Sequence, residues 1–276
     1  MRIEINGLSF HVIDEGQGPP VLLLHGFPDS SHLWRQQIRA LTRAGYRVIA
    51  PDLRGFGASD RPENVEDYAL PLLLGDVVGV LDTLGVERAT VVGHDWGAAL
   101  GWTLAAMIPD RVERLVALTV GHPNGFFADP IGQRQLSWYI LFFLFPGVAE
   151  EALLRDDWAL FRTFVRGEGD FERYLRDLER PGALTAGLNW YRANISPQAF
   201  GQDNPMTLPP VSCPVMGIWA SRDVALGEAQ MLASATHVTG PWRYERLDDV
   251  GHWIPLEAPD RLNQLLTDFI PAPSPA

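Results

Sequence analysis

The sequence predicts an α/β fold, with a mostly parallel sheet of eight strands, helices on both faces and a helical insertion. Three observations lead to this fold class. From residue 20 to residue 120, short apolar runs alternate with helix-like stretches, as in consecutive βαβ units. The alternation stops at residues 124–207, and it resumes from residue 214 to residue 269.

The first elements predict a hairpin followed by a buried strand. Residues 2–5 and 9–13 flank Asn6-Gly7, a favoured two-residue hairpin turn. Residues 20–24 are continuously apolar, which is typical of a strand covered on both faces.

The later elements follow from the same apolar patterns. We expect helices at residues 33–43, 71–84, 97–107, 227–234 and 259–269. We expect strands at residues 47–50, 89–92, 115–120, 214–220 and 243–247.

Residues 124–207 show helical periodicity, many aromatic side chains and no convincing strand. We therefore expect residues 1–123 and 208–276 to form one α/β core, into which residues 124–207 insert as a helical cap. Open α/β sheets bind ligands at the carboxyl edge of their strands. A cap seated over that edge would act as a lid.

Composition restricts the functional classes. The formal net charge of −12 over 276 residues disfavours nucleic acids and anionic membranes, which bind basic faces. The longest apolar stretch, residues 138–145, is too short to span a bilayer. Cys213 is the only cysteine, so no disulfide within the chain is expected, and residues 1–4 read as a strand rather than a signal segment. We expect a cytoplasmic protein with no metal or other cofactor.

Gly93-His94-Asp95-Trp96-Gly97 joins an expected strand to an expected helix and has the form of a nucleophile elbow. In such a turn a strained backbone lifts the central side chain clear of the sheet. Strand and helix nearly touch there, so only glycine fits at the outer positions. The helix start offers N–H groups and a positive dipole end, which we expect to keep Asp95 ionised. The alternative is an aspartate that only caps the helix.

Three further residues are candidate partners of Asp95. Phe27, in His-Gly-Phe-Pro at residues 25–28, follows the first buried strand, and its N–H could join that of Trp96 in an oxyanion hole. Asp223 and His252 follow later strands, which completes the chain order nucleophile, acid, histidine. The alternatives are a simple tight turn at residues 25–28 and a surface position for the histidine.

Other polar residues near these motifs have weaker claims. Asp248 and Asp249 are rivals to Asp223, but both lie closer to the preceding strand. We expect four residues to pack or to support the site rather than to transfer protons: His25, His94, His122 and Arg54.

These motifs resemble those of the α/β-hydrolase superfamily, and within it those of the soluble epoxide hydrolases, over essentially the whole chain. Two cap stretches sharpen the resemblance: residues 139–150, which end in Pro-Gly-Val-Ala-Glu, and Leu-Asn-Trp-Tyr-Arg at residues 188–192. In that family one tyrosine from each stretch points at the nucleophile, and the matching residues here are Tyr139 and Tyr191. The aspartate elbow is shared with dehalogenases, so the paired tyrosines are the more specific signal.

The resemblance implies an enzyme that adds water to a hydrophobic epoxide to give a vicinal diol. Asp95 would attack a saturated carbon and form an alkyl ester, which water activated by His252 and Asp223 would hydrolyse. Tyr139 and Tyr191 would protonate the departing oxygen. The alternative for each tyrosine is an aromatic residue of the core.

The cap is rich in Phe, Trp and Leu, so we expect an apolar pocket. The residues expected to line it are Phe27, Trp96, His122, Trp138, Trp190 and Trp253. A homodimer is a further expectation, since some cap aromatics would be exposed.

Two other functions stay open. Haloalkane dehalogenases also use an aspartate elbow and match Trp96, but Phe27 offers no side-chain donor to a halide, so Trp138 or Trp190 would have to. Fluoroacetate-type dehalogenases place an arginine where Trp96 stands. A hydrolase-like ligand receptor would need only one catalytic position to be lost, and every such position is present.

Overall fold

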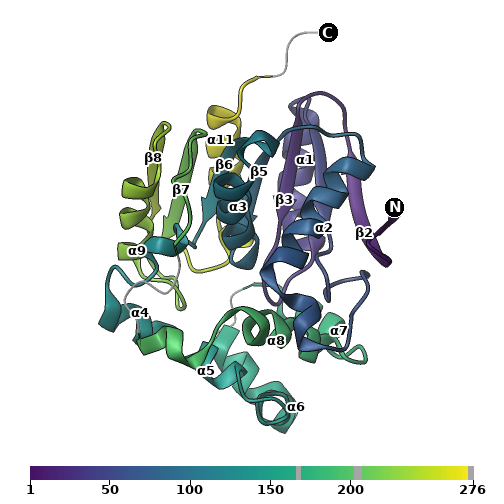
Figure 1. Ribbon diagram of the computed structural model, residues 1–276, viewed down its shortest axis with the longest axis vertical. Coiled ribbons are helices and arrows are strands. Elements are labelled where there is room, and N and C mark those ends of the chain that lie inside the picture. The colour runs from purple at the N-terminus through teal and green to yellow at the C-terminus, as the bar shows by residue number, and fades with distance from the viewer. Residues whose placement is uncertain (166–168, 202–206, 273–276) are drawn as a thin grey trace.

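A sheet of eight strands runs through the molecule, with helices on its faces and a further group of helices beyond one end (Figure 1). The computed structural model describes residues 1–165, 169–201 and 207–272. The strand order is β1-β2-β4-β3-β5-β6-β7-β8. The strands are β1 (Arg2–Ile5), β2 (Leu8–Glu15), β3 (Pro20–Leu24), β4 (Arg47–Pro51), β5 (Ala89–His94), β6 (Val112–Leu118), β7 (Val215–Ala220) and β8 (Trp242–Leu247).

The expected sheet is confirmed. Strand β2 is antiparallel to both of its neighbours, whereas β4, β3, β5, β6, β7 and β8 are parallel. The central strands β3 and β5 have buried residues almost throughout, because helices cover both faces of the sheet. Leu24 pairs with Gly93 and Ala220 with Leu247, so the carboxyl ends of β3, β5, β7 and β8 meet at one edge.

Helices cover the two faces of the sheet in pairs. Helix α1 (Arg35–Arg43) packs against α11 (Pro259–Phe269) behind the sheet in Figure 1, and α2 (Leu70–Thr83) packs against α3 (Trp96–Met107) in front. Two short helices, α9 (Glu228–Ala233) and α10 (Ile254–Glu257), complete the core. Strand β6 begins earlier than the expected residue 115, since half-buried polar residues at its start interrupt the apolar pattern.

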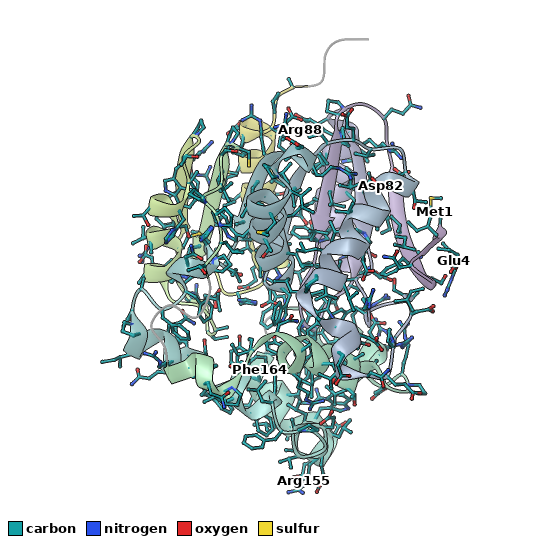
Figure 2. The ribbon with its side chains drawn as sticks, in the orientation of Figure 1. Met1, Glu4, Asp82, Arg88, Arg155 and Phe164 are labelled. Carbon is teal, nitrogen blue, oxygen red and sulfur yellow. The ribbon has the colours of Figure 1, made fainter. Side chains whose placement is uncertain are left out.

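In the described part of the chain, five α-helices lie between β6 and β7 in the sequence, and they are called the cap helices below. They are α4 (Pro130–Leu136), α5 (Trp138–Phe143), α6 (Val148–Val165), α7 (Phe171–Leu178) and α8 (Ala183–Asn194). Helix α6 is interrupted by non-helical backbone at residues 155–158. The cap helices lie beyond the carboxyl edge of the parallel strands (Figure 1). Phe164 lies on the side of the cap that faces the sheet, and Arg155 lies at its far end (Figure 2).

Side-chain hydrogen bonds join the cap helices to the core. Asn194, the last residue of α8, accepts a hydrogen bond from the N–H of Leu70 and donates one to the carbonyl of Tyr68. The side chain of Asn124 both donates to the carbonyl of Leu208 and accepts from its N–H. The segments that leave and re-enter the core are therefore tied to each other.

One apolar core extends from the sheet into the cap helices. Phe27 of the core contacts the rings of Phe143, Phe161 and Tyr191 in the cap helices. Among the described residues, no helix combines the length and the apolar character needed to cross a bilayer.

Candidate active site

Asp95 lies in a strained turn at the carboxyl edge of the sheet. It separates β5 from α3 and has φ 54° and ψ −123°, a backbone conformation that residues other than glycine rarely adopt. A Cβ atom at Gly93 would collide with the backbone of Gly97, and one at Gly97 would collide with the carbonyl of Leu24. The steric account of the elbow therefore agrees with the structure.

The two oxygens of Asp95 have different neighbours. Oδ1 accepts a hydrogen bond of 2.8 Å from the N–H of Phe27. Oδ2 lies 3.9 Å from Nε2 of His252, too far for a direct hydrogen bond. Gly26 allows this approach, because a Cβ there would overlap the Asp95 side chain. One oxygen is therefore held by the backbone while the other faces the imidazole.

His252 is oriented by Asp223. Its Nδ1 lies 2.9 Å from Oδ2 of Asp223, whose Oδ1 accepts hydrogen bonds from the N–H groups of Ala225 and Leu226. The rival aspartates point elsewhere: Asp248 pairs with Arg246, and Asp249 pairs with Arg222 at the surface. The structure thus brings Asp95, His252 and Asp223 together.

Burial and nearby charges shift the pKa values of Asp95 and His252. Burial raises the pKa of Asp95, although His252 and the N–H groups of Trp96 and Phe27 lower it in part. Desolvation outweighs these donors, so they offset only part of the rise in the pKa of Asp95. Burial lowers the pKa of His252, but Asp223, Asp95 and Asp29 together raise it to about 9. The imidazole is accordingly protonated near neutral pH.

His25 and His94 support the backbone of the site. Nε2 of His25 accepts a hydrogen bond from the N–H of Leu53, and Nε2 of His94 lies 2.9 Å from the carbonyl of His252. Burial lowers the pKa of both imidazoles, and the effect is larger for His94. Both rings are therefore neutral, and neither faces the cavity beside Asp95.

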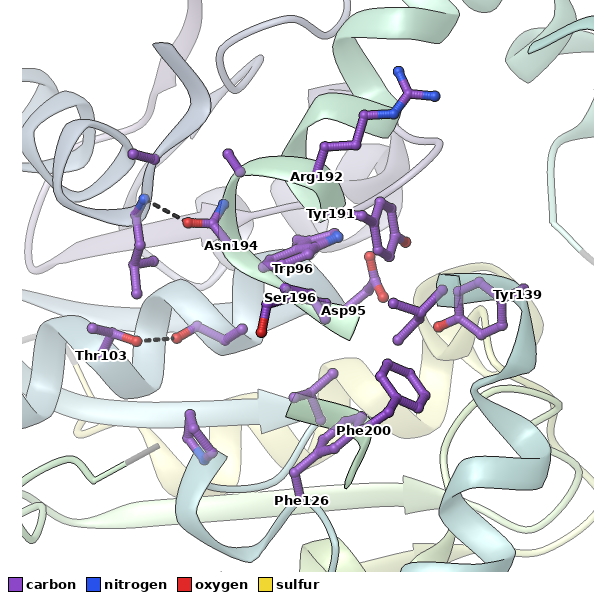
Figure 3. A pocket seen from close by; sticks show the side chains of 18 of the residues that line it. Asp95, Trp96, Thr103, Phe126, Tyr139, Tyr191, Arg192, Asn194, Ser196 and Phe200 are labelled. Carbon is purple, nitrogen blue, oxygen red and sulfur yellow. Dashed lines mark hydrogen bonds between the residues drawn. The ribbon is translucent and has the colours of Figure 1, made fainter. Parts of the chain in front are cut away.

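Tyr139 of α5 and Tyr191 of α8 are buried beside Asp95 (Figure 3). Their ring centroids are 6.2 Å apart. Burial raises the pKa of both phenols well above 10, and the charge of Asp95 raises each further. Both hydroxyl groups therefore stay protonated at neutral pH and can donate hydrogen bonds.

Two cavities meet at these residues. The larger has a volume of about 730 Å³, and its apolar lining includes Ala99, Val120, Phe126, Phe200 and Leu226. The smaller has a volume of about 10 Å³ and lies beside Phe27, Phe164, Val224, His252 and Trp253. Asp95, Tyr139 and Tyr191 line both.

The structure places three of the expected pocket residues elsewhere. The side chain of Trp138 is 53% exposed, because successive residues of a helix point about 100° apart and Tyr139 occupies the inner face. The indole N–H of Trp190 donates to the carbonyl of Arg54. His122 is buried away from the cavities and stacks on His237 with ring centroids 4.7 Å apart.

The other three expected pocket residues do line a cavity. Trp96 lines the larger one, and Phe27 and Trp253 line the smaller. Among the described residues, no group of three histidine, cysteine, aspartate or glutamate side chains is arranged to hold a metal ion.

Asp29 is a buried carboxyl group that the sequence reasoning missed. Its Oδ2 accepts hydrogen bonds from the indole N–H of Trp253 and the hydroxyl of Tyr174. Burial raises its pKa to about 8, although these two donors and His252 lower it, while Asp95 raises it. Its position directly after residues 25–28 was a usable signal, but an aspartate after proline also reads as an ordinary turn residue.

Comparisons with known proteins show the family and the fold of the chain. A family model described as the alpha/beta hydrolase fold matches residues 19–259. The AB hydrolase superfamily protein YfhM of Bacillus subtilis is 35% identical over 97% of this chain and 96% of its own length. Epoxide hydrolase A of Mycobacterium tuberculosis is 32% identical over 97% of this chain and 96% of its own.

A similar solved structure is that of a mutant epoxide hydrolase from Bacillus megaterium. It superimposes with a TM-score of 0.88 at 29% identity, covering 98% of this chain and 99% of the other.

Proposed function

The chain belongs to the epoxide hydrolase family of the α/β hydrolases, and on this premise we propose that it hydrolyses a hydrophobic epoxide to a vicinal diol through an alkyl ester of Asp95. The observation that carries the proposal is the meeting of a backbone-held carboxylate, an imidazole and two protonated phenols at one apolar cavity.

In the first step, Oδ2 of Asp95 attacks an epoxide carbon, because Oδ1 is already held by the N–H of Phe27. The carbon–oxygen bond on the far side breaks, and its electron pair goes to the epoxide oxygen. An alkoxide is a poor leaving group unless it receives a proton, which Tyr139 or Tyr191 donates. The product of this step is an ester and one phenolate.

In the second step, His252 becomes the base. The ester no longer carries the negative charge of Asp95, which helps to raise the pKa of His252 in the free enzyme. The imidazolium therefore releases its proton to solvent water more readily. The neutral ring then accepts a proton from the attacking water, while Asp223 holds Nδ1. The hydroxide attacks the carbonyl carbon of Asp95, and Oδ1 becomes an oxyanion beside the N–H groups of Phe27 and Trp96.

The protons balance over the cycle. Collapse of the tetrahedral intermediate breaks the bond between the carbonyl carbon and Oδ2, which leaves with the diol. The imidazolium of His252 protonates this departing oxygen. The regenerated carboxylic acid of Asp95 returns its proton to the phenolate. His252 regains from solvent water the proton that it released before the second step, so that one epoxide and one water give one diol.

The cap helices act as a lid in this proposal. They supply Tyr139 and Tyr191, and they separate the reacting groups from bulk water, which strengthens the electrostatic interactions at the site.

Dehalogenation of a haloalkane is the second candidate function. The buried indole N–H of Trp96, beside the hydroxyl of Tyr191, could donate a hydrogen bond to a halide. However, Trp138 is exposed and the indole N–H of Trp190 is occupied, so neither supplies the second donor that a halide site needs. The epoxide reaction explains the two phenols, and halide departure needs no proton.

The test is a trapped ester. His252→Gln, incubated with styrene oxide, is expected to gain the mass of one substrate, because the ester forms and is not hydrolysed. The double variant Asp95→Asn/His252→Gln is the control and is expected to gain no mass. If the wild type converts styrene oxide to the diol but His252→Gln forms no adduct, the two-step scheme is wrong. Release of chloride from 1-chlorohexane, without diol from styrene oxide, would favour the second candidate.

A further inference from the structure

The two cavities beside Asp95 differ greatly in volume, about 730 Å³ against about 10 Å³. Asp95, Tyr139 and Tyr191 line both, so the nucleophile and the proton donors stand where the two cavities meet. This difference bears on the substrate of the reaction proposed above.

An epoxide at that junction points its two carbons in different directions. The oxygen must face the phenols and one carbon must face Oδ2 of Asp95. The carbon–carbon bond then runs across the line between them, so the substituents of the two carbons diverge. One set of substituents enters the larger cavity, and the other set must fit on the side of the smaller one.

The smaller cavity holds about one water molecule and no more. Phe164 closes it on the cap side, with its ring centroid 4.8 Å from that of Tyr139. Trp253 closes it on the core side, where its indole N–H is bound to Asp29. A phenyl or alkyl chain on this side would have to displace one of these packed rings, which is costly in a dense interior.

Phe27 adds a third fixed wall. Its ring contacts the rings of Phe56, Phe143, Phe161 and Tyr191, so it cannot move without disturbing both the core and the cap.

The larger cavity has the opposite character. It extends from Trp96 and Ala99 past Phe126 and Phe200 to residues 193–197 (Figure 3). Its volume lies in the range of pockets that bury most of a small organic ligand, and its lining is mainly apolar.

We propose that the enzyme is selective for terminal epoxides, which carry a bulky apolar group on one carbon and only hydrogens on the other. The bulky group occupies the larger cavity, and the unsubstituted carbon lies toward Phe164 and Trp253. Epoxides with bulky groups on both carbons are excluded. The proposal rests on the proposed function and adds the substrate class to it.

A graded substrate series tests the proposal. Styrene oxide, trans-β-methylstyrene oxide and trans-stilbene oxide differ only in the group on the second carbon, which is hydrogen, methyl or phenyl. We expect kcat/KM for diol formation to fall along the series, by about 100-fold or more from styrene oxide to trans-stilbene oxide.

Variants of Phe164 and Val224, which line the smaller cavity, separate steric fit from the intrinsic reactivity of each epoxide. The quantity compared between proteins is the ratio of kcat/KM for two epoxides, from which intrinsic reactivity cancels. Phe164→Ala is expected to raise the ratio of kcat/KM for trans-stilbene oxide to that for styrene oxide by about tenfold or more. Val224 lines the same small cavity. Val224→Ala should raise the ratio of kcat/KM for trans-β-methylstyrene oxide to that for styrene oxide, and it tests the proposal even if Phe164→Ala fails to fold. Phe126→Ala removes the same atoms as Phe164→Ala from the larger cavity and should raise neither ratio.

The outcomes are distinguishable. Similar kcat/KM values for all three epoxides, within about threefold, overturn the inference and leave the proposed function intact. The inference is also overturned if Phe126→Ala raises the ratios as much as the folded wall variants do. If the enzyme hydrolyses none of the three epoxides, both the proposed function and the inference are overturned.

Discussion

The sheet edge and the cap helices hold their functional side chains in different ways. At the sheet edge, Asp95 is held by a strained turn and the N–H of Phe27, and Asp223 by two N–H groups. In the cap, Tyr139 and Tyr191 are positioned mainly by rings packed around them, such as Phe143 and Phe164.

This difference separates two tasks. Backbone hydrogen bonds fix the direction of a polar group closely, which suits the atoms that make and break bonds. Packed rings fix a volume and allow repacking when a neighbour changes size. We therefore expect substitutions at the sheet edge to remove turnover and substitutions in the cap to change which substrates react.

Asp223→Asn should give the largest effect in the comparison. The amide cannot stabilise an imidazolium and favours the wrong tautomer of His252, so hydrolysis of the ester should slow by about 10³- to 10⁴-fold. Rapid-quench measurement of ester formation and hydrolysis would separate the two steps. Asp248→Asn is the matched control, since that carboxylate is 73% exposed and pairs with Arg246. Equal losses in both variants would contradict the special position of Asp223.

Tyr139→Phe and Tyr191→Phe should give an intermediate effect on the other side of the comparison. Each is expected to slow ester formation from styrene oxide by about 10- to 100-fold, and the double variant by about 1000-fold or more. Any turnover of a haloalkane should change much less, because a halide leaves without a proton. Stopped-flow tryptophan fluorescence can follow ester formation, since Trp96 lies beside the site. Equal slowing of both reactions would remove the proton-donor role.

Asp29→Asn should give the smallest effect, and on stability rather than turnover. The folded protein keeps a proton on Asp29 up to a pKa of about 8, whereas the unfolded chain releases it near 3.8. Asp29 therefore stabilises the folded state at low pH, and this contribution is lost as the pH rises from about 4 to about 8. The Tm of the wild type should fall several degrees more over this range than that of Asp29→Asn. Parallel Tm profiles would show that Asp29 does not titrate in this way.

The comparison also separates what the sequence could predict from what it could not. The elbow could be predicted from the sequence because its geometry depends on glycines at fixed spacing around Asp95. In the structure, a Cβ at either Gly93 or Gly97 would collide with backbone atoms. Asp223 could be chosen over Asp248 and Asp249 because those two lie closer to the preceding strand. In the structure, Oδ2 of Asp223 lies 2.9 Å from Nδ1 of His252.

The positions of side chains in the cap were harder to predict from the sequence. A helix turns about 100° per residue, so an error of one residue in its phase moves a side chain from the cavity to the surface. Trp138 was misplaced for this reason, whereas Trp190 is buried and its indole N–H donates to the carbonyl of Arg54 in the core. Asp29 was missed because its burial depends on Trp253 and Tyr174, which are distant in the sequence.

The paired hydrogen bonds between Asn124 and Leu208 have an evolutionary consequence. Asn124 and Leu208 lie at the two ends of the segment that leaves the sheet and returns to it. Because these ends are bonded to each other, the core can keep its structure whatever the length of that segment. Lengthening, shortening or replacing it costs little in loop-closure entropy and leaves the neighbouring strands where they are. An ancestral scaffold joined in this way can acquire a new specificity and new proton donors by exchanging the cap, while the aspartate, the histidine and the oxyanion donors of the core are inherited unchanged.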